Sequence, residues 1–275
     1  MPELPEVETL RRGLERHLAG TCFTNIRVLV PKMVKGTITE ADVFISLLRG
    51  SQIQTIKRRG KHLIFTLDSG YHLLLHLNMR GQLLIMSPET PEAKYLAAAF
   101  LVNNGLELRF HDMWTWGEMR LVKDGELTSH PALLGMGMEP FSAEWTPQAL
   151  SASLGKRGKT AIKAALLDQT VLAGLGNIYA DESLFRSGIQ PLRPAGSLSE
   201  AESQRLHCEI RAVLTEATGD GGTTSDNYVD TDGRIGRYVP RVYERAGKPC
   251  LSCGTALTRI KITGRGTVYC SNCQR

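Results

Sequence analysis

The cysteines at the C-terminus constrain the possible fold of this chain more than any other sequence feature. Four of the six lie there as two C-x2-C pairs separated by sixteen residues: Cys250, Cys253, Cys270 and Cys273. Each pair offers two thiolates to one side of a tetrahedral ion, and sixteen residues suffice for a β-hairpin that brings the pairs together. The spacing therefore predicts one Zn²⁺. Because sulfur fills all four positions, water has no place on the ion, and we expect the zinc to be structural.

Disulfide bonds are the alternative use of these cysteines. Adjacent C-x2-C pairs hold so small a hairpin poorly, and a cytosolic chain keeps its thiols reduced. We expect a cytoplasmic chain because the N-terminal segment is acidic, unlike a secretory leader, and no apolar run is long enough to span a membrane. Cys22 and Cys208 lie in a strand-like and a helical run, where we expect packing or surface positions without chemistry. Nothing indicates an obligate oligomer, so we expect a monomer.

The positive charge is concentrated at the same end of the chain. Residues 241–275 hold seven Lys or Arg against one acid, a formal charge of +6, whereas the whole chain carries +5. A basic segment on a nearly neutral body is typical of a protein that meets a polyanion such as nucleic acid with one face. A solvated basic tail without a partner is the alternative.

Hydrophobic periodicity divides the chain into two parts of different character. Apolar residues at intervals of three and four predict a helix over 6–18, and a capping box of Ser199 and Glu202 begins another over 199–218. Short β-rich runs separated by turns fill 22–122 and predict a β-sandwich that carries the first helix. The expected strands include 23–30, 62–67, 72–77, 82–86 and 106–110.

These patterns predict an α+β multidomain protein. We expect an N-terminal β-sandwich domain over 1–132, a hinge over 133–145, a helical domain over 146–240 and a zinc-bound hairpin over 241–275. Residues 219–241 are rich in Gly, Asp and Thr, which favours a flexible loop ahead of the hairpin.

The N-terminal sequence MPELPEVET suggests a nucleophile. Removal of Met1 would leave Pro2 as a free secondary amine, and a chain-terminal amine has a pKa of about 7.7–8.0, so part of it is unprotonated at neutral pH. Glu3 would sit beside it as an acid or base. In the alternative interpretation Pro2 is an ordinary terminal residue and Pro5 merely begins a helix.

Three further segments could contact an anionic ligand. Asn177 follows the glycine-rich LAGLG run and could cap a helix whose free N–H groups face a phosphate, and Lys163 upstream is either a phosphate contact or part of a solvated helix face. The run KRRGK ending at Lys61 places four cations on one hairpin, unless it is only a solubilising turn.

Met79, at the end of a strand, looks exposed, although most such methionines belong to a core.

Taken together, these segments resemble the formamidopyrimidine-DNA glycosylase and endonuclease VIII family. The matching segments are MPELPEVET, RRGK, HLNM, AGLGNIYADE, GGTT and GRGTVYCSNC, in order from the first residue to the last. The resemblance implies a β-sandwich, a helix-two-turns-helix domain and a zinc hairpin. It also implies a bifunctional repair enzyme that acts on double-stranded DNA containing damaged bases or abasic sites.

The resemblance implies specific roles for matching residues. Pro2 would attack C1′ of the damaged nucleotide, Glu3 would act as acid and base, Lys61 would assist elimination, and Arg265 would grip phosphate. Met79 would fill the void left by the everted nucleotide. Further active-site or DNA-binding positions are Glu6, His76, Lys163 and Asn177.

One segment departs from the family pattern. Where the family has Asp-x-Arg-x-Phe-Gly, which supplies an arginine to the orphaned opposite base and a phenylalanine wedge, this chain has Asp112 to Gly117, reading DMWTWG. Trp116 can still wedge by stacking and Trp114 can stack too, but neither presents the charged hydrogen-bond fork. Alternatively, both tryptophans pack against the sandwich. Lys94-Tyr95-Leu96-Ala97 stands where many members have Lys-His-Asp-His.

Three functions remain open from the sequence. The first is a lyase-active glycosylase for oxidised bases, by default oxidised purines such as 8-oxoguanine and formamidopyrimidines. The second is the same Pro2 chemistry acting mainly on abasic sites or another lesion class. The third is a non-catalytic protein that binds damaged DNA, against which the joint presence of Pro2, Glu3, Lys61 and Arg265 argues.

Overall fold

The computed structural model describes residues 2–224 and 228–275, which form two compact units. Unit 1 comprises Met1–Leu134 and Asp220–Arg237, and unit 2 comprises Gly135–Gly219 and Tyr238–Arg275. The described residues of the segment 220–237 thus pack with the β-rich unit, whereas the sequence grouped this segment with the helical domain. The predicted flexible loop includes Ser225, Asp226 and Asn227, which lie outside the described residues.

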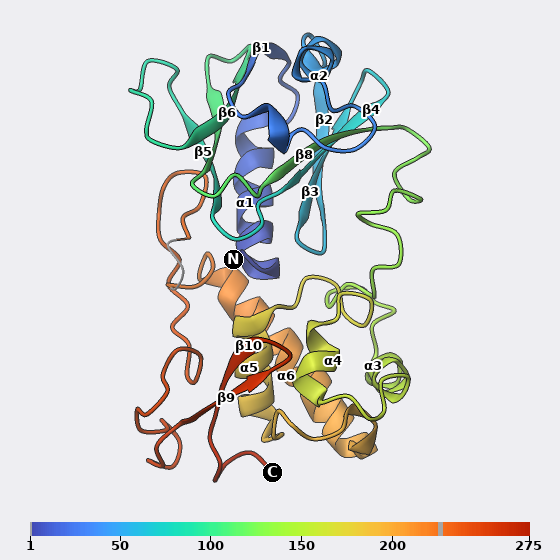
Figure 1. The fold of residues 1–275 in the computed structure, drawn as a ribbon, viewed down its shortest axis with the longest axis vertical. Coiled ribbons are helices and arrows are strands. Elements are labelled where there is room, and N and C mark those ends of the chain that lie inside the picture. Colours follow the sequence, from blue (N-terminus) through green and yellow to red (C-terminus); the bar gives the residue numbers. More distant parts are fainter. Residues whose placement is uncertain (1, 225–227) are drawn as a thin grey trace. The chain divides into compact units, whose positions relative to one another are not determined.

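Unit 1 is built from two four-stranded antiparallel sheets, as the β-sandwich prediction requires (Figure 1). The sheet order β1-β6-β7-β5 uses β1 (Phe23–Val28), β5 (Gly81–Met86), β6 (Leu96–Val102) and β7 (Glu107–Asp112). The sheet order β2-β3-β4-β8 uses β2 (Ile53–Arg59), β3 (His62–Leu67), β4 (Tyr71–His76) and β8 (Glu118–Lys123). Helices α1 (Leu4–Leu18) and α2 (Ala41–Leu48) and the 3-10 turn η1 (Pro31–Met33) complete the unit.

Helix α1 contacts β2 and β3 of one sheet and β5 of the other. Its face of Val7, Leu10, Leu14 and Leu18 is at most 1% exposed and joins the main core cluster, as the spacing predicted. The helix begins at Leu4, two residues before the predicted start, because Glu3 and Glu6 form a capping box around its first turn. Helix α2 was missed, because eight residues are too short to show a helical period.

Unit 2 contains four α-helices within its described residues, followed by a β-hairpin (Figure 1). The helices are α3 (Pro147–Gly155), α4 (Ile162–Leu167), α5 (Asn177–Ser187) and α6 (Glu200–Gly219), with a 3-10 turn η2 (Ala195–Ser197). Strands β9 (Thr258–Ile262) and β10 (Arg265–Tyr269) pair antiparallel. In the part of the chain described, no helix combines the length and the apolar character that crossing a membrane requires.

The predicted capping box at the start of α6 is confirmed. The Ser199 amide donates to Glu202 Oε2 over 2.8 Å, and the Glu202 amide donates back to Ser199 Oγ over 3.3 Å. Arg193 bonds the same carboxylate and, with Ser199, lowers the pKa of Glu202 to about 2. Both bonds of the capping box are therefore formed by residues close to the helix start, without a contact from a distant segment.

Candidate active site

The N-terminus of α1 is fixed by two buried carboxylates. Glu3 is 2% exposed and Glu6 is 1% exposed. The Glu3 amide donates to Glu6 Oε2 over 2.9 Å, and the Val7 amide donates to the Glu3 carbonyl over 3.0 Å. Pro2, immediately before this cap, is partly buried and lines a cavity of about 210 Å³ in unit 1. The predicted nucleophile thus faces an open space from a rigid helix end.

Glu6 ties the segment after α6 to this helix end. Its Oε1 accepts from the Thr223 amide over 2.9 Å, and its carbonyl accepts from the Tyr228 hydroxyl over 3.2 Å. Burial raises the pKa of Tyr228, so the hydroxyl stays protonated and can donate. Gly222 has a φ of +96°, and a Cβ there would lie 2.6 Å from the Tyr228 ring. The glycine of the GGTT motif therefore permits the close approach.

The cavity is walled by β5, by the end of β7 and by the segment before β6. Its lining residues are Pro2, Glu6, Met79, Arg80, Gly81, Gln82, Leu84, Ala93, Lys94, Tyr95, His111, Met113, Thr223 and Tyr228. His111 is 6% exposed, and its Nε2 has no hydrogen-bond partner among the described residues. Burial lowers the pKa of His111, so the imidazole is neutral at pH 7. His111 carries no signal in the sequence and was not predicted; it stands opposite Gln82 in the β5–β7 register.

The RRGK motif forms the turn of the β2–β3 hairpin rather than a solvated loop. Gly60 takes a φ of +55°, and Lys61 after it is only 9% exposed. Arg58 Nε contacts Glu8 Oε2 on α1 over 3.2 Å. The motif is therefore built into the unit, and Lys61 is held at a defined place.

His76 lies opposite His62 across the β3–β4 pair, and their rings stack with centroids 4.3 Å apart. Burial lowers the pKa of both, that of His62 to about 3. The ammonium of Lys61 adds to the lowering at His76. Both imidazoles are therefore neutral at pH 7, and His76 can act as a neutral hydrogen-bonding group.

Three large apolar side chains form an exposed patch on unit 1: Met79, Trp114 and Trp116 are 38%, 38% and 55% exposed. The two indole rings lie 4.9 Å apart at 53°, and the Arg80 guanidinium carbon lies 5.3 Å from the Trp114 ring centroid. Met79 therefore does not belong to the core, and the tryptophans do not pack into the sandwich. Large exposed apolar groups beside a cavity are typical of a binding surface.

The loop that carries the tryptophans is shaped by Asp112. Its carboxylate accepts from the Trp114 amide over 3.0 Å and from the Gly117 amide over 2.6 Å. A Cβ on Gly117 would lie 2.5 Å from the Phe110 ring, so only glycine fits there. Asn78 Nδ2 donates to the Trp116 carbonyl and links this loop to the one carrying Met79. The patch is thus held by specific bonds although its rings are exposed.

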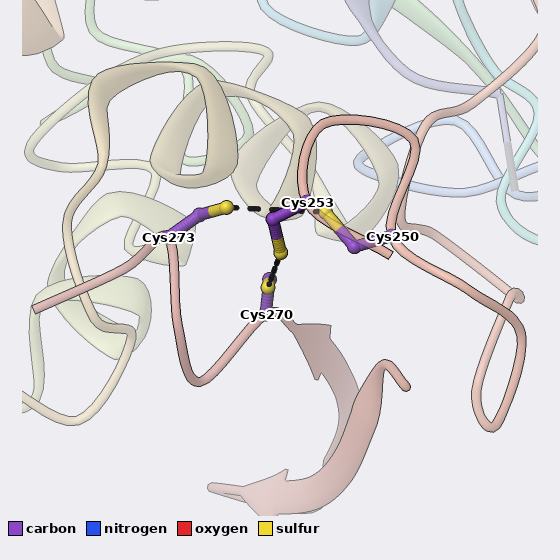
Figure 2. Close-up of side chains that lie close together, drawn as sticks. All are labelled: Cys250, Cys253, Cys270 and Cys273. Carbon is purple, nitrogen blue, oxygen red and sulfur yellow. Dashed lines mark hydrogen bonds between the residues drawn. The ribbon is translucent and has the colours of Figure 1, made fainter. Parts of the chain in front are cut away.

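In unit 2, the four predicted zinc ligands converge (Figure 2). All four sulfur atoms lie within 4.8 Å of one another. The Cys250–Cys273 pair is 3.9 Å apart and the Cys253–Cys270 pair 3.5 Å. Zn–S bonds of about 2.3 Å in a tetrahedron place the sulfurs about 3.8 Å apart, so the group fits one Zn²⁺. Cys22 and Cys208 lie elsewhere, half-buried and exposed.

Lys163 is neither a solvated residue nor a surface phosphate contact. Its side chain is 0% exposed and pairs with Asp181 Oδ1 over 2.7 Å. The ammonium also donates to Thr267 Oγ1 over 2.8 Å and to the Gly266 carbonyl over 3.0 Å. Because α4 presents this side toward α5 and β10, the charge anchors the hairpin instead of facing solvent.

We predicted Asn177 as the N-cap of α5, but Gly176 occupies the N-cap and Asn177 is the first residue of the helix. Its Nδ2 donates to the Gly266 carbonyl over 3.1 Å, so it joins Lys163 on the same strand. Its buried Oδ1 has no hydrogen-bond partner among the described residues. Arg265, the neighbour of Gly266, is exposed at the start of β10. The two anchors therefore fix the backbone that presents Arg265.

Glu182 lies within the NIYADE motif and has a structural role that the motif did not predict. It is fully buried, and its carboxylate accepts from the amides of Arg241, Val242 and Tyr243 over 2.8–2.9 Å. The Tyr238 hydroxyl adds a contact of 3.3 Å. This carboxylate organises the segment that leads into the zinc hairpin.

Comparison with known families accounts for most of the chain. Residues 1–119 match the formamidopyrimidine-DNA glycosylase N-terminal domain, and residues 136–228 match the formamidopyrimidine-DNA glycosylase H2TH domain. Residues 247–275 match the zinc finger found in FPG and IleRS.

Individual relatives agree with these matches. A formamidopyrimidine-DNA glycosylase of Bacillus cereus is 42% identical over 276 residues, covering 100% of this chain and 99% of its own. The Lactococcus lactis Fpg solved with DNA containing an abasic site has a TM-score of 0.92 at 33% identity, covering 99% of both chains. MutM solved with DNA containing carbocyclic 8-oxo-G has a TM-score of 0.91 at 33% identity, covering 100% of both.

Proposed function

Because the chain belongs to the formamidopyrimidine-DNA glycosylase family, we propose that it excises oxidised bases from double-stranded DNA and cleaves the strand at the resulting abasic site. The observation that carries the proposal is Pro2, which precedes the Glu3–Glu6 cap and lines a cavity. The default substrates are oxidised purines, since solved relatives bind DNA containing carbocyclic 8-oxo-G or Fapy-dG. We also propose a cytoplasmic location for this activity on DNA.

The first step is displacement of the damaged base. After removal of Met1, the Pro2 nitrogen forms a bond to C1′ while the bond from C1′ to the base breaks. The base leaves with the bonding electrons and takes up a proton. Loss of the N–H proton and opening of the sugar, in which O4′ is protonated, then give an iminium. Glu3, adjacent to Pro2 and 2% exposed, is the acid and base for these proton transfers.

The iminium makes strand cleavage possible because it acidifies the C2′ proton. Removal of that proton breaks the C3′–O bond and releases the 3′ phosphate, and a second elimination breaks the C5′–O bond. Lys61 assists these eliminations from the β2–β3 turn, where it is nearly buried. Arg265, on the hairpin anchored by Lys163 and Asn177, binds a phosphate at the lesion.

Zinc has a structural part in this scheme. Cys250, Cys253, Cys270 and Cys273 would hold it, and the bound ion would supply the cross-link that holds the hairpin together. Met79 and Trp116 fill and wedge the gap left by the everted nucleotide, as their exposure allows.

The two other hypotheses are not favoured. A non-catalytic DNA-binding protein needs no terminal secondary amine beside a buried carboxylate. A pure abasic-site lyase needs no cavity next to that amine, yet Pro2 lines one of about 210 Å³.

Borohydride trapping tests the proposal directly. The protein is incubated with duplexes that contain 8-oxoguanine, an oxidised pyrimidine or an abasic site, and borohydride then reduces any iminium to a stable adduct. We expect adducts with 8-oxoguanine and abasic DNA, and peptide mapping should place them on Pro2. Adducts on abasic DNA alone would favour the lyase, and no adduct on any duplex would favour the non-catalytic protein.

A further inference from the structure

Arg80 is a cation of unit 1 for which the mechanism above has no use. Its guanidinium carbon lies 5.3 Å from the centroid of the Trp114 ring. Among the residues that the structure describes, no carboxylate forms an ion pair with it. Arg80 also lines the cavity that Pro2 faces. A charged group is therefore held at the border between the cavity and the exposed aromatic patch.

The contact with Trp114 fixes the guanidinium without consuming its hydrogen bonds. An arginine held over an indole is attracted by the negative ring face, while its N–H donors remain free to bond other groups. The backbone that carries Trp114 is held in place, because its amide donates to Asp112 Oδ1 over 3.0 Å. The guanidinium thus has an aromatic ring on one side and donors available on the other.

The surroundings indicate which ligand these donors meet. Met79 precedes Arg80, and Trp116 lies beside Trp114 with ring centroids 4.9 Å apart. Asn78 bonds the Trp116 carbonyl, so the two loops form one surface. Exposed rings that stack on bases, next to a free guanidinium, match an unpaired nucleotide rather than a phosphate alone.

We propose that Arg80, supported by Trp114, binds the pairing edge of the base that loses its partner when the damaged nucleotide leaves the duplex. This assignment rests on the proposed function and names a specificity residue for it. Arg80 contacts the substrate, whereas Trp114 is a positioning residue that acts through Arg80.

The parallel N–H donors of the Arg80 guanidinium favour one of the four bases. A guanidinium offers parallel donors and no acceptor, so it needs two neighbouring acceptors. On the pairing edge, cytosine has such a pair in O2 and N3. Adenine and guanine each have one acceptor there, and the two acceptors of thymine are separated by an N–H donor. Arg80 therefore favours a lesion that was paired with cytosine.

Binding and trapping, measured side by side, test the assignment. The affinity of the wild type for duplexes with a tetrahydrofuran abasic analogue opposite each of the four bases is measured by fluorescence anisotropy. Borohydride trapping on abasic DNA opposite each base is measured in parallel. The variants are Arg80→Ala, Arg80→Lys, Trp114→Ala and Trp114→Phe. Arg49→Ala, which removes an exposed arginine after α2, is the matched control.

We expect the wild type to prefer cytosine by on the order of 10-fold, the discrimination that a bidentate pair provides. Arg80→Ala and Arg80→Lys should reduce this ratio to about one, because lysine keeps the charge but not the fork. Trp114→Ala should lower the preference and Trp114→Phe should retain most of it. Arg49→Ala should leave the preference unchanged.

Three outcomes would overturn the assignment: no preference in the wild type, a preference that survives Arg80→Ala, or an equal loss of affinity on all four duplexes. The last would make Arg80 a phosphate contact. If no duplex gives an adduct but Arg80→Ala still abolishes the binding preference, the proposed function fails and the role of Arg80 stands.

Discussion

Replacing Lys163 by methionine should loosen the zinc hairpin, and by more at alkaline than at acidic pH. The ammonium contacts Asp181 Oδ1 at 2.7 Å, Thr267 Oγ1 at 2.8 Å and the Gly266 carbonyl at 3.0 Å. Methionine retains most of the volume of the lysine side chain but leaves Asp181 with an uncompensated buried charge. Removing one partner of a buried pair costs about 3–5 kcal/mol.

The pH dependence follows from Asp181. Burial raises the pKa of this carboxyl to about 6, even though Lys163 lowers it. Without Lys163, only the hydrogen bond from the Val268 amide still opposes the effect of burial, and the pKa of Asp181 rises further. The folded variant then takes up a proton that the unfolded chain, with an ordinary carboxyl pKa, does not bind at pH 6. The cost of the substitution should therefore fall toward about 1–3 kcal/mol at pH 6, the loss expected for unpaired neutral groups.

Hydrogen exchange with peptide-level mass spectrometry measures the loss of stability in the hairpin itself. The free energy of opening of β9 and β10 is obtained at pH 6 and pH 8 after correction for intrinsic exchange rates, with zinc present. The double variant Lys163→Met, Asp181→Asn is the control, since its neutral amide should give the same loss at both pH values. A change below about 1 kcal/mol at pH 8, or equal losses for the single variant at both pH values, would refute the reasoning.

Four further outcomes are expected. An extra residue ahead of Pro2 should abolish borohydride trapping while DNA binding persists; undiminished trapping would identify another amine as the nucleophile. Gly222→Ala should destabilise unit 1 by about 1–3 kcal/mol, seen as a lower melting temperature, because the added Cβ meets the Tyr228 ring at 2.6 Å and the backbone has φ +96°. Chelation of zinc should expose the hairpin to protease and weaken DNA binding, so an equally protected metal-free protein would contradict the structural assignment. Because the pKa of His62 is lowered to about 3, the unfolded chain binds more protons than the folded chain between pH 6.5 and 3, and stability is lost as the pH falls through that range. Urea titrations at pH 7 and pH 4 measure this loss, which His62→Leu should lessen. An unchanged loss in the variant would count against the role of His62.

Local patterns in the sequence were sufficient for much of the fold. The cysteine spacing predicts the sulfur cluster, and the apolar period predicts the buried face of α1. The capping box at Ser199 marks the start of α6. Each of these signals lies within one turn, one helix or one hairpin, where the geometry of the backbone relates spacing to position.

The candidate site was predicted only in part. The motifs identify Pro2, Glu3 and Lys61 as candidates, but they do not show that Glu6 bonds the Thr223 amide far along the chain. His111 carries no local pattern, because its importance comes from burial beside a cavity.

Three features were decided by the tertiary structure. Lys163 reads as a solvated cation in its own helix, yet Asp181 and the hairpin enclose it. The segment 220–237 looks like a linker in the sequence, but its described residues pack with unit 1. The pairing of Arg80 with Trp114 joins two loops that share no pattern. Spacing along the chain encodes which neighbours face the same way, whereas burial, ion pairing and ring contacts depend on which distant segments meet, and only the packed fold settles that.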